Sequence, residues 1–291
     1  GRATTVASAL QVSARRLENE YLRIDLDARG EITRVFDKET GRDFAAGRCN
    51  TLRLYKDIPT NCDAWDIDSA YEKQPVPVDG EATVKVVSEG PLVAVLKVTR
   101  KFGASLLEQE IRLRRGSRRV DFKTRVDWRE RHRMLKVGFD VDIHADEALQ
   151  EIQYGHVRRP THRTRPHDHE RFEVCHHKWT AMVEETRGVA ILNDCKYGVS
   201  VLGQTMNLTL LRSPLRPDKY ADQGVQEFTY AMLVWNGSLA DSGVVAQAYD
   251  LNVPVTTAPG DSGTASFLAV DAPNIVIEAV KPAEDGSGDL I

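Results

Sequence analysis

Apolar and polar residues alternate with a period of two along most of this sequence, and apolar positions at helical spacing are hard to find. Successive side chains of a β-strand point to opposite faces of a sheet, so the alternation predicts strands that bury one face. Many such strands without helices between them favour a large antiparallel β-sandwich. The predicted fold class is therefore all-β.

Two segments predict β-hairpins. Residues 22–26 and 32–35 alternate on either side of a turn at 27–30, and residues 107–113 and 120–128 repeat this scheme. Further strands are expected at 83–88, 92–101, 135–143, 188–193, 198–202, 206–211, 227–235, 244–251 and 275–280.

The sequence suggests one β-sandwich domain over residues 1–255, with a linker and the start of a truncated further β element over 256–291. Two irregular stretches, 56–80 and 153–180, interrupt the strands, and loops held on a rigid sheet are where functional residues usually lie. The motif "LNDCKYG" follows an expected strand, and a structural hairpin is favoured there over a sugar contact.

Charge and composition exclude several classes of function. The formal net charge is -4, and the 28% of residues that are charged include both signs, so no basic field is available for nucleic acid. No apolar run reaches the roughly 18–20 residues that cross a bilayer, and the N-terminus lacks the order of a signal peptide. We expect a soluble protein, assigned to the cytoplasm, whose four cysteines form neither a disulfide framework nor a zinc site.

Residues 156–177 contain six histidines and several arginines. Their spacing lacks an HExxH or paired CxxC pattern, so polar loop packing is favoured over a zinc site. Arg158, Arg159, Arg163 and Arg165 could clamp an anion, but the neighbouring acids favour a salt-bridged loop.

The stretch "DIPTNCDAWDID" places several carboxylates around Trp65. An indole and carboxylates suit contact with a sugar, and a glycosidase needs two carboxyls about 5–9.5 Å apart. Asp63, Asp66 and Asp68 could supply them, although neighbouring acids in a loop more often form turns or pair with arginine. Serine-hydrolase and phosphate-loop motifs are absent from the sequence.

Several segments occur in the order found in one family of glycosidases. They are "DAWDID", "GHVRRPTHR", "HKW", "GVAILNDCKYG", "LLRSP" followed by "PD", "AD", "EFTYAML" and "NIVIEAVKPAED". Together they cover most of residues 17–285, and on them the chain resembles the C-terminal β-rich half of glycoside hydrolase family 38, the α-mannosidases.

The resemblance implies a β-supersandwich like that of galactose mutarotase, behind an N-terminal α/β catalytic domain that this sequence does not contain. In the family that domain carries the nucleophilic aspartate and binds a divalent metal, usually zinc, and the full enzyme is retaining. None of those motifs has a match in this sequence. The resemblance therefore implies no catalytic residue, metal ligand or cofactor within this chain.

For site residues, the resemblance places Asp63, Trp65 and Asp66 at the domain interface or the rim of the sugar pocket, and His156 and Arg158 are assigned to the same surface. The expected partners are the chain's own catalytic domain and α-mannoside glycans, and a homo-oligomer is left open. Two alternatives remain. The sandwich could bind carbohydrate by itself, or act as a mutarotase-like aldose epimerase, which needs a His and a Glu facing each other across a concave sheet.

Overall fold

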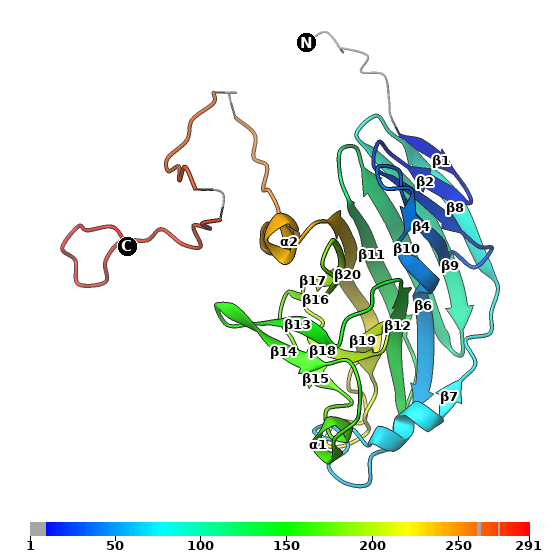
Figure 1. Cartoon of the computed structure of the whole chain (residues 1–291). Helices are drawn as coiled ribbons and strands as arrows, with labels where there is room; N and C mark the ends of the chain where they lie inside the picture. Colours follow the sequence, from blue (N-terminus) through cyan, green and yellow to red (C-terminus); the bar gives the residue numbers. More distant parts are fainter. Residues whose placement is uncertain (1–9, 261–262, 273) are drawn as a thin grey trace. The chain divides into compact units, whose positions relative to one another are not determined.

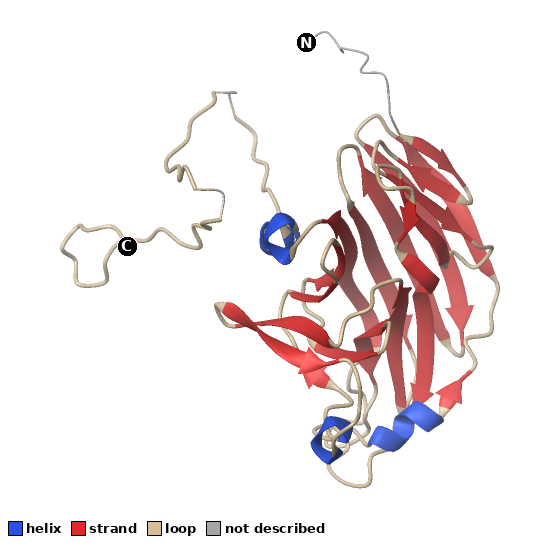
Figure 2. Cartoon of the chain, viewed as in Figure 1, coloured by secondary structure: helices blue, strands red, loops and turns tan. Residues whose placement is uncertain are grey.

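Two antiparallel sheets face one another in this computed structural model (Figure 1), and strands dominate its secondary structure (Figure 2). The structure describes residues 10–260, 263–272 and 274–291, and the chain forms two units, Gly1–Asn252 and Val253–Ile291. Both sheets belong to the first unit. The predicted all-β fold class, a large antiparallel β-sandwich, is confirmed.

The eleven-stranded sheet runs in the order β1 (Gln11–Ser13), β2 (Arg16–Glu18), β3 (Leu22–Leu26), β4 (Ile32–Asp37), β6 (Ala45–Lys56), β12 (Arg133–Val141), β19 (Thr205–Arg212), β18 (Gly198–Leu202) and β15 (Val174–Cys175), with β5 (Arg42–Asp43) beside β4 and β7 (Pro75–Val76) beside β6. The nine-stranded sheet runs in the order β14 (Gly155–Pro160), β13 (Glu147–Ile152), β16 (Trp179–Val183), β17 (Arg187–Asn193), β20 (Gly224–Asn236), β11 (Arg119–Trp128), β10 (Ser105–Arg114), β9 (Val93–Phe102) and β8 (Ala82–Glu89). The described helical elements are η1 (Ser69–Lys73), α1 (Pro166–His169), η2 (Leu239–Asp241) and α2 (Val244–Asn252).

Both predicted hairpins are confirmed, because β3 pairs with β4 and β10 pairs with β11, each antiparallel. The turn between β3 and β4 requires glycine at Gly30. Its φ is +78°, and a Cβ at this position would lie 2.6 Å from the Cγ2 of Val98. The turn therefore lies directly against the opposite sheet.

The main core lies between the sheets and contains stacked aromatic rings. Phe122 and Tyr230 of the nine-stranded sheet have ring centroids 5.0 Å apart, and Phe139 of the other sheet lies 6.0 Å from Phe122. A smaller apolar cluster lies on β16, β17 and β20, where α2 covers Trp179 and Leu192.

Four buried neutral side chains link the two sheets through hydrogen bonds, and we call them the core quartet: Asn50, Gln109, Thr124 and Tyr230. Gln109 Nε2 donates to Tyr230 Oη (2.8 Å) and Thr124 Oγ1 (2.9 Å), and its Oε1 accepts from Asn50 Nδ2 (2.7 Å). Tyr230 Oη donates to Asn50 Oδ1 (2.6 Å). These bonds connect β6 to three strands of the opposite sheet and specify how the sheets align.

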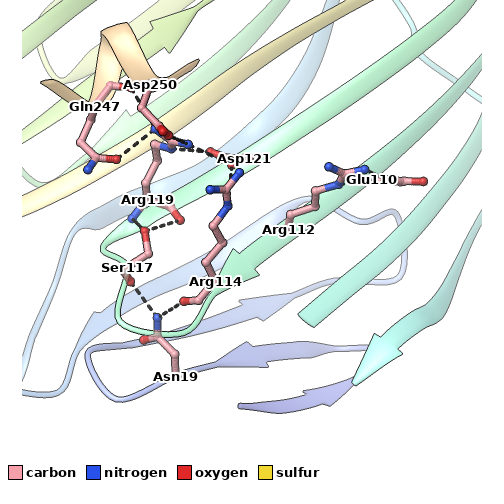
Figure 3. A network of polar contacts seen from close by, with 9 residues as sticks. All are labelled: Asn19, Glu110, Arg112, Arg114, Ser117, Arg119, Asp121, Gln247 and Asp250. Carbon is pink, nitrogen blue, oxygen red and sulfur yellow. Dashed lines mark hydrogen bonds and ion pairs between the residues drawn. The ribbon is translucent and has the colours of Figure 1, made fainter. Parts of the chain in front are cut away.

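The strand predicted at 244–251 is wrong, since these residues form the helix α2. Val244 and Ala248 lie one helical turn apart and are both buried in the smaller apolar cluster. The buried Arg119 binds the other side of the helix, as Figure 3 shows, donating to Gln247 O (2.9 Å) and Asp250 Oδ2 (2.8 Å). Packing on the sheet therefore determines the conformation of this short segment.

Two further expectations are wrong. The "LNDCKYG" turn is no hairpin, because β17 before it belongs to the nine-stranded sheet and β18 after it to the other sheet. Residues 275–280 form no strand, since the described part of the second unit supplies no pairing partner for them. Pairing there begins only at Lys281, which exchanges backbone hydrogen bonds with Ile291. In the 153–180 stretch the structure contains β14, α1 and β15, which the alternation did not predict.

Candidate functional site

Loops from both irregular stretches gather at one end of the sheets, where α1 and the helical turn between β6 and β7 lie (Figure 1). The first is the 57–68 loop, which leaves the end of β6 and carries "DAWDID". The second is the 161–173 segment, which follows β14.

Asp63 fixes the 57–68 loop to its neighbours. Its Oδ2 accepts hydrogen bonds from the backbone N–H groups of Leu215 (2.6 Å) and Arg216 (3.1 Å), and lies 3.2 Å from His132 Nε2. Burial raises the pKa of Asp63, but these donors outweigh it and hold the pKa below its usual range. Asp63 is thus an ionised carboxylate used to join three loops.

Arg212, at the end of β19, provides a second attachment. Its Nε donates to Asp57 Oδ2 (2.7 Å), and its Nη2 donates to the carbonyl oxygen of Asp66 (2.7 Å). Asp57 is buried, so the pair is shielded from solvent on that side. The loop is therefore held at both of its halves.

Trp65 lies within this fixed loop, and 77% of its surface is exposed. The Asp66 carboxylate is also exposed and accepts only from its neighbour Ile67 N–H (2.9 Å) among the described contacts. Asp68 is engaged in capping η1 through Ala70 N–H (2.9 Å). The three acids thus have separate local partners, and the indole is the group that projects from the loop.

A largely buried cluster, which we call the loop anchor, joins η1 and the 161–173 segment to the outer face of the eleven-stranded sheet: Lys136, Glu173, Tyr71, Ser200 and Thr209. Lys136 is 1% exposed and donates to Glu173, to Tyr71 Oη (3.2 Å) and to Ser200 Oγ (3.1 Å). Burial and the adjacent Glu173 carboxylate raise the pKa of Tyr71, which keeps its hydroxyl protonated. All three ammonium donors are satisfied.

The helical turn η1, which directly follows the 57–68 loop, contacts the 161–173 segment. Arg163 donates from both terminal nitrogens to the two carboxylate oxygens of Glu72, at 2.7 and 2.6 Å. Such bidentate pairs combine strength with defined geometry. Tyr71 of η1 and Phe172 of the second segment have ring centroids 6.3 Å apart. We therefore treat the two loops as one surface.

His156 and Arg158 lie on β14, at the edge of the nine-stranded sheet. The His156 ring lies 5.9 Å from the Trp179 ring, and Arg158 pairs with Glu147 at 3.5 Å. Within the described part of the chain, neither side chain has a hydrogen bond or ion pair with the 57–68 loop. The structure thus brings Asp63, Trp65 and Asp66 together but places these two residues separately.

The histidine-rich stretch does not gather into a set of metal ligands. Among residues 10–260, 263–272 and 274–291, no group of three or more His, Cys, Asp or Glu side chains is placed to hold a metal ion. The buried His176 instead contacts Thr180 Oγ1 through Nδ1 (2.7 Å) and the Lys196 carbonyl through Nε2 (3.2 Å). The His144 side chain is 75% exposed and its Nε2 lies 3.9 Å from Asp142 Oδ1.

The arginines of 158–165 do not converge on one ligand. Arg163 and Arg165 pair with Glu72 and Asp168, while Arg159 donates to Gln150 and to the Cys175 carbonyl. This arrangement matches the salt-bridged loop that was favoured over an anion clamp.

The described helices are all too short to span a bilayer.

Sequence reasoning missed three residues on which this surface depends: His132, Lys136 and Arg212. Arg212 lies within the recognised "LLRSP" segment, so a signal was present. Lys136 lies on the outward-facing row of β12, where η1 and the 161–173 segment cover it. Only the tertiary structure reveals that cover.

Comparison with known proteins identifies the family. The Glycosyl hydrolases family 38 C-terminal domain matches residues 17–220. The chain belongs to this family. Among family 38 relatives, Alpha-mannosidase 2C1 of Homo sapiens is 40% identical over 279 residues, covering 92% of this chain and 26% of the relative. Alpha-mannosidase G of Dictyostelium discoideum is 35% identical over 290 residues, covering 94% of this chain and 27% of that relative.

The fold also matches solved structures. A family 38 protein from Enterococcus faecalis has a TM-score of 0.77 and 18% identity, covering 100% of this family 38 chain and 39% of that protein. An alpha-mannosidase from Enterococcus faecalis V583 has a TM-score of 0.73 and 17% identity, and the match covers 90% of this chain and 34% of that protein. At this identity the likeness concerns the fold. The chain spans about a quarter of the length of the curated relatives it matches.

Proposed function

We propose that this chain is the non-catalytic C-terminal β-sandwich of an α-mannosidase, and that its 57–68 loop docks against the catalytic domain at the rim of the sugar pocket. The observation that carries the proposal is the exposure of Trp65 on a loop that Asp63 and Arg212 hold rigidly. Large exposed aromatic residues on pre-organised loops are frequent energetic centres of interfaces.

The family supports the assignment of chemistry to another part of the protein. This chain matches the C-terminal domain of the family. It spans about a quarter of the length of relatives that are named alpha-mannosidases. In this proposal the catalytic domain supplies the nucleophile and binds the divalent metal, zinc, while the sandwich supplies only surface. By itself the chain is then without α-mannosidase activity, and its partners are that domain and α-mannoside glycans.

A chimera tests the docking role. The quarter of the human relative that this chain matches is replaced by residues 1–291, and α-mannoside hydrolysis and thermal stability are measured with and without Trp65→Ala. Loss of a central interface aromatic weakens association by about 2 kcal/mol. Where docking of the sandwich limits activity, we therefore expect hydrolysis to fall about tenfold or more. Tyr154→Ala, at a 95% exposed tyrosine on another turn, is the matched control and should have no effect. Equal activity of the Trp65 and Tyr154 variants would refute the docking role.

A second candidate function rests on the same indole. An exposed Trp65 beside the exposed Asp66 carboxylate could bind a glycan without a catalytic domain. Calorimetric titration of the chain with mannose oligosaccharides at millimolar concentration separates the two candidates. Heat that Trp65→Ala abolishes favours sugar binding, whereas no heat favours a purely architectural role.

A further inference from the structure

A pocket of about 450 Å³ lies beside β6, where the eleven-stranded sheet has a gap. The strand β4 pairs with β6 only at Ile32 and Cys49, and β7 pairs with it at Leu54 and Tyr55. Between these points, over residues 50–53, the described chain supplies no strand on that side of β6. The pocket is thus a feature of the sheet itself, at the gap between β4 and β7.

Guanidinium groups dominate the charged lining of this pocket. The arginines are Arg29, Arg48, Arg53 and Arg100, and the carboxylates are Glu31 and Asp79. Arg100 is only 3% exposed and donates to Glu31 Oε1 (3.1 Å), while Arg48 donates to Glu31 Oε2 (2.9 Å). Two arginines therefore share one carboxylate at the base of the pocket.

Arg29 and Arg100 converge on a single neutral acceptor. The carbonyl oxygen of Val78 accepts from Arg29 Nη2 (2.5 Å) and from Arg100 Nη2 (2.7 Å). Among the residues that the structure describes, no carboxylate lies within ion-pair distance of Arg29. Burial lowers the pKa of Arg100, and the charge of Arg29 lowers that pKa further. Two cations packed around one carbonyl would be stabilised by an anion.

The walls of the pocket also contain hydrogen-bond donors that are not used. Arg100 Nε and Thr51 Oγ1 are buried, and neither has a hydrogen-bond partner within the described residues. Buried polar groups in native structures are nearly always hydrogen-bonded, so two unpaired donors in the wall of one pocket are unusual. Arg29 and Arg48 are exposed. Arg48 Nη1 already pairs with Asp27 and Glu31, so within the described residues its Nε and Nη2 are the donors left for a ligand.

We propose that this pocket binds a phosphate group, either as the free ion or as the ester of a small sugar, through Arg29 and Arg48. Guanidinium groups bind phosphate oxygens through paired, charge-assisted hydrogen bonds. The cavity exceeds the size of a phosphate ion and falls within the range of small-molecule sites, which leaves room for an attached sugar. This inference is independent of the docking role of Trp65.

The test is calorimetric titration of the whole chain with inorganic phosphate at constant ionic strength, with sodium chloride as the ionic control. We expect saturable binding that Arg29→Gln and Arg48→Gln each weaken about tenfold, as for loss of one charge-assisted contact. Arg125→Gln is the matched control, because Arg125 is an exposed arginine on β11 outside this pocket. A hexose 6-phosphate and the unphosphorylated hexose form the second arm. Tighter binding of the ester identifies a sugar phosphate, and equal binding identifies recognition of the phosphate group alone.

Three results would overturn the proposal. Chloride could reproduce the phosphate signal, both pocket variants could keep full affinity, or Arg125→Gln could lose as much affinity as they do. Unfolding in urea without phosphate verifies that the variants are folded. Arg29 is suited to this test because it is exposed, and its described hydrogen bond goes to a backbone carbonyl of a neighbouring segment.

Discussion

The core quartet and the loop anchor are both buried polar clusters, but they differ in charge and in what they connect. The core quartet is neutral and joins the two sheets, whereas the loop anchor contains the Lys136–Glu173 ion pair and joins loops to the outside of one sheet. A neutral network that is fully hydrogen-bonded costs little to bury, while each member of a buried ion pair depends on its partner. We infer that alignment of the sheets tolerates change better than placement of the functional loops.

The largest expected effect is that of removing the charge from the loop anchor. Lys136→Met leaves the Glu173 carboxylate buried without its cation, and breaking such a pair costs about 3–5 kcal/mol of unfolding free energy. Urea unfolding at pH 7 measures it. The double variant Lys136→Met with Glu173→Met should recover most of the loss, because no unpaired charge remains. A loss below about 1 kcal/mol for the single variant would remove the distinction between the clusters.

The buried His176 and its contacts, Thr180 Oγ1 and the Lys196 carbonyl, form a third polar cluster, which is uncharged only while the imidazole is deprotonated. His176 is buried at the connection between the sheets, and burial lowers its pKa from 6.5 to about 4. The unfolded chain therefore binds this proton more readily than the folded chain between pH 6.5 and 4, so stability falls as the pH falls through that window. Between pH 7 and 5 we expect a loss of about 2 kcal/mol.

The check is urea unfolding of the chain and of His176→Gln at both pH values. The variant should be less stable at pH 7 but lack this part of the pH dependence. Parallel pH profiles for the two proteins would show that His176 does not titrate as the buried geometry requires.

The core quartet should give a smaller effect. Tyr230→Phe removes the hydroxyl that donates to Asn50 and accepts from Gln109, but Gln109 still donates to Thr124. We expect a loss of about 1 kcal/mol, typical of a hydrogen bond in a network that keeps other partners. Unfolding in urea measures it, and a loss equal to that of Lys136→Met would contradict the proposed difference between the clusters.

The smallest effect on stability is expected at Trp65, although it is central to the proposed function. With 77% of its surface exposed, Trp65→Ala should change the unfolding free energy of the chain by less than about 0.5 kcal/mol. The same urea assay measures this change. A large destabilisation would mean that the indole packs on its own domain and is not available for docking.

The fold was largely predictable because alternation reports which face of a strand is buried. Gln109 and Thr124 lie within the second predicted hairpin, on the inward rows of β10 and β11, and both belong to the core quartet. Alternation fails for short apolar segments whose partner decides the structure. The 244–251 segment forms a helix because its apolar side packs on the smaller apolar cluster and its backbone accepts a hydrogen bond from Arg119. The 275–280 segment lacks a pairing partner among the described residues.

The site was predictable only in part. The motif located Asp63 and Trp65, but not that Asp63 serves as a hydrogen-bond acceptor between loops while the indole projects. Lys136 was missed because period two separates the faces of a strand and cannot tell solvent from a covering loop. His156 and Arg158 were grouped with Trp65 by resemblance alone, and both lie on β14, which pairs with β13 at the edge of the nine-stranded sheet.

The most direct test of the account is turnover of a chromogenic α-mannoside by residues 1–291 alone, with and without added zinc. If the chain provides only a supporting surface, hydrolysis stays at the level of a protein-free control under both conditions. Robust, metal-dependent hydrolysis by this chain would contradict the central claim, because it would place the catalytic carboxylates within the sandwich itself.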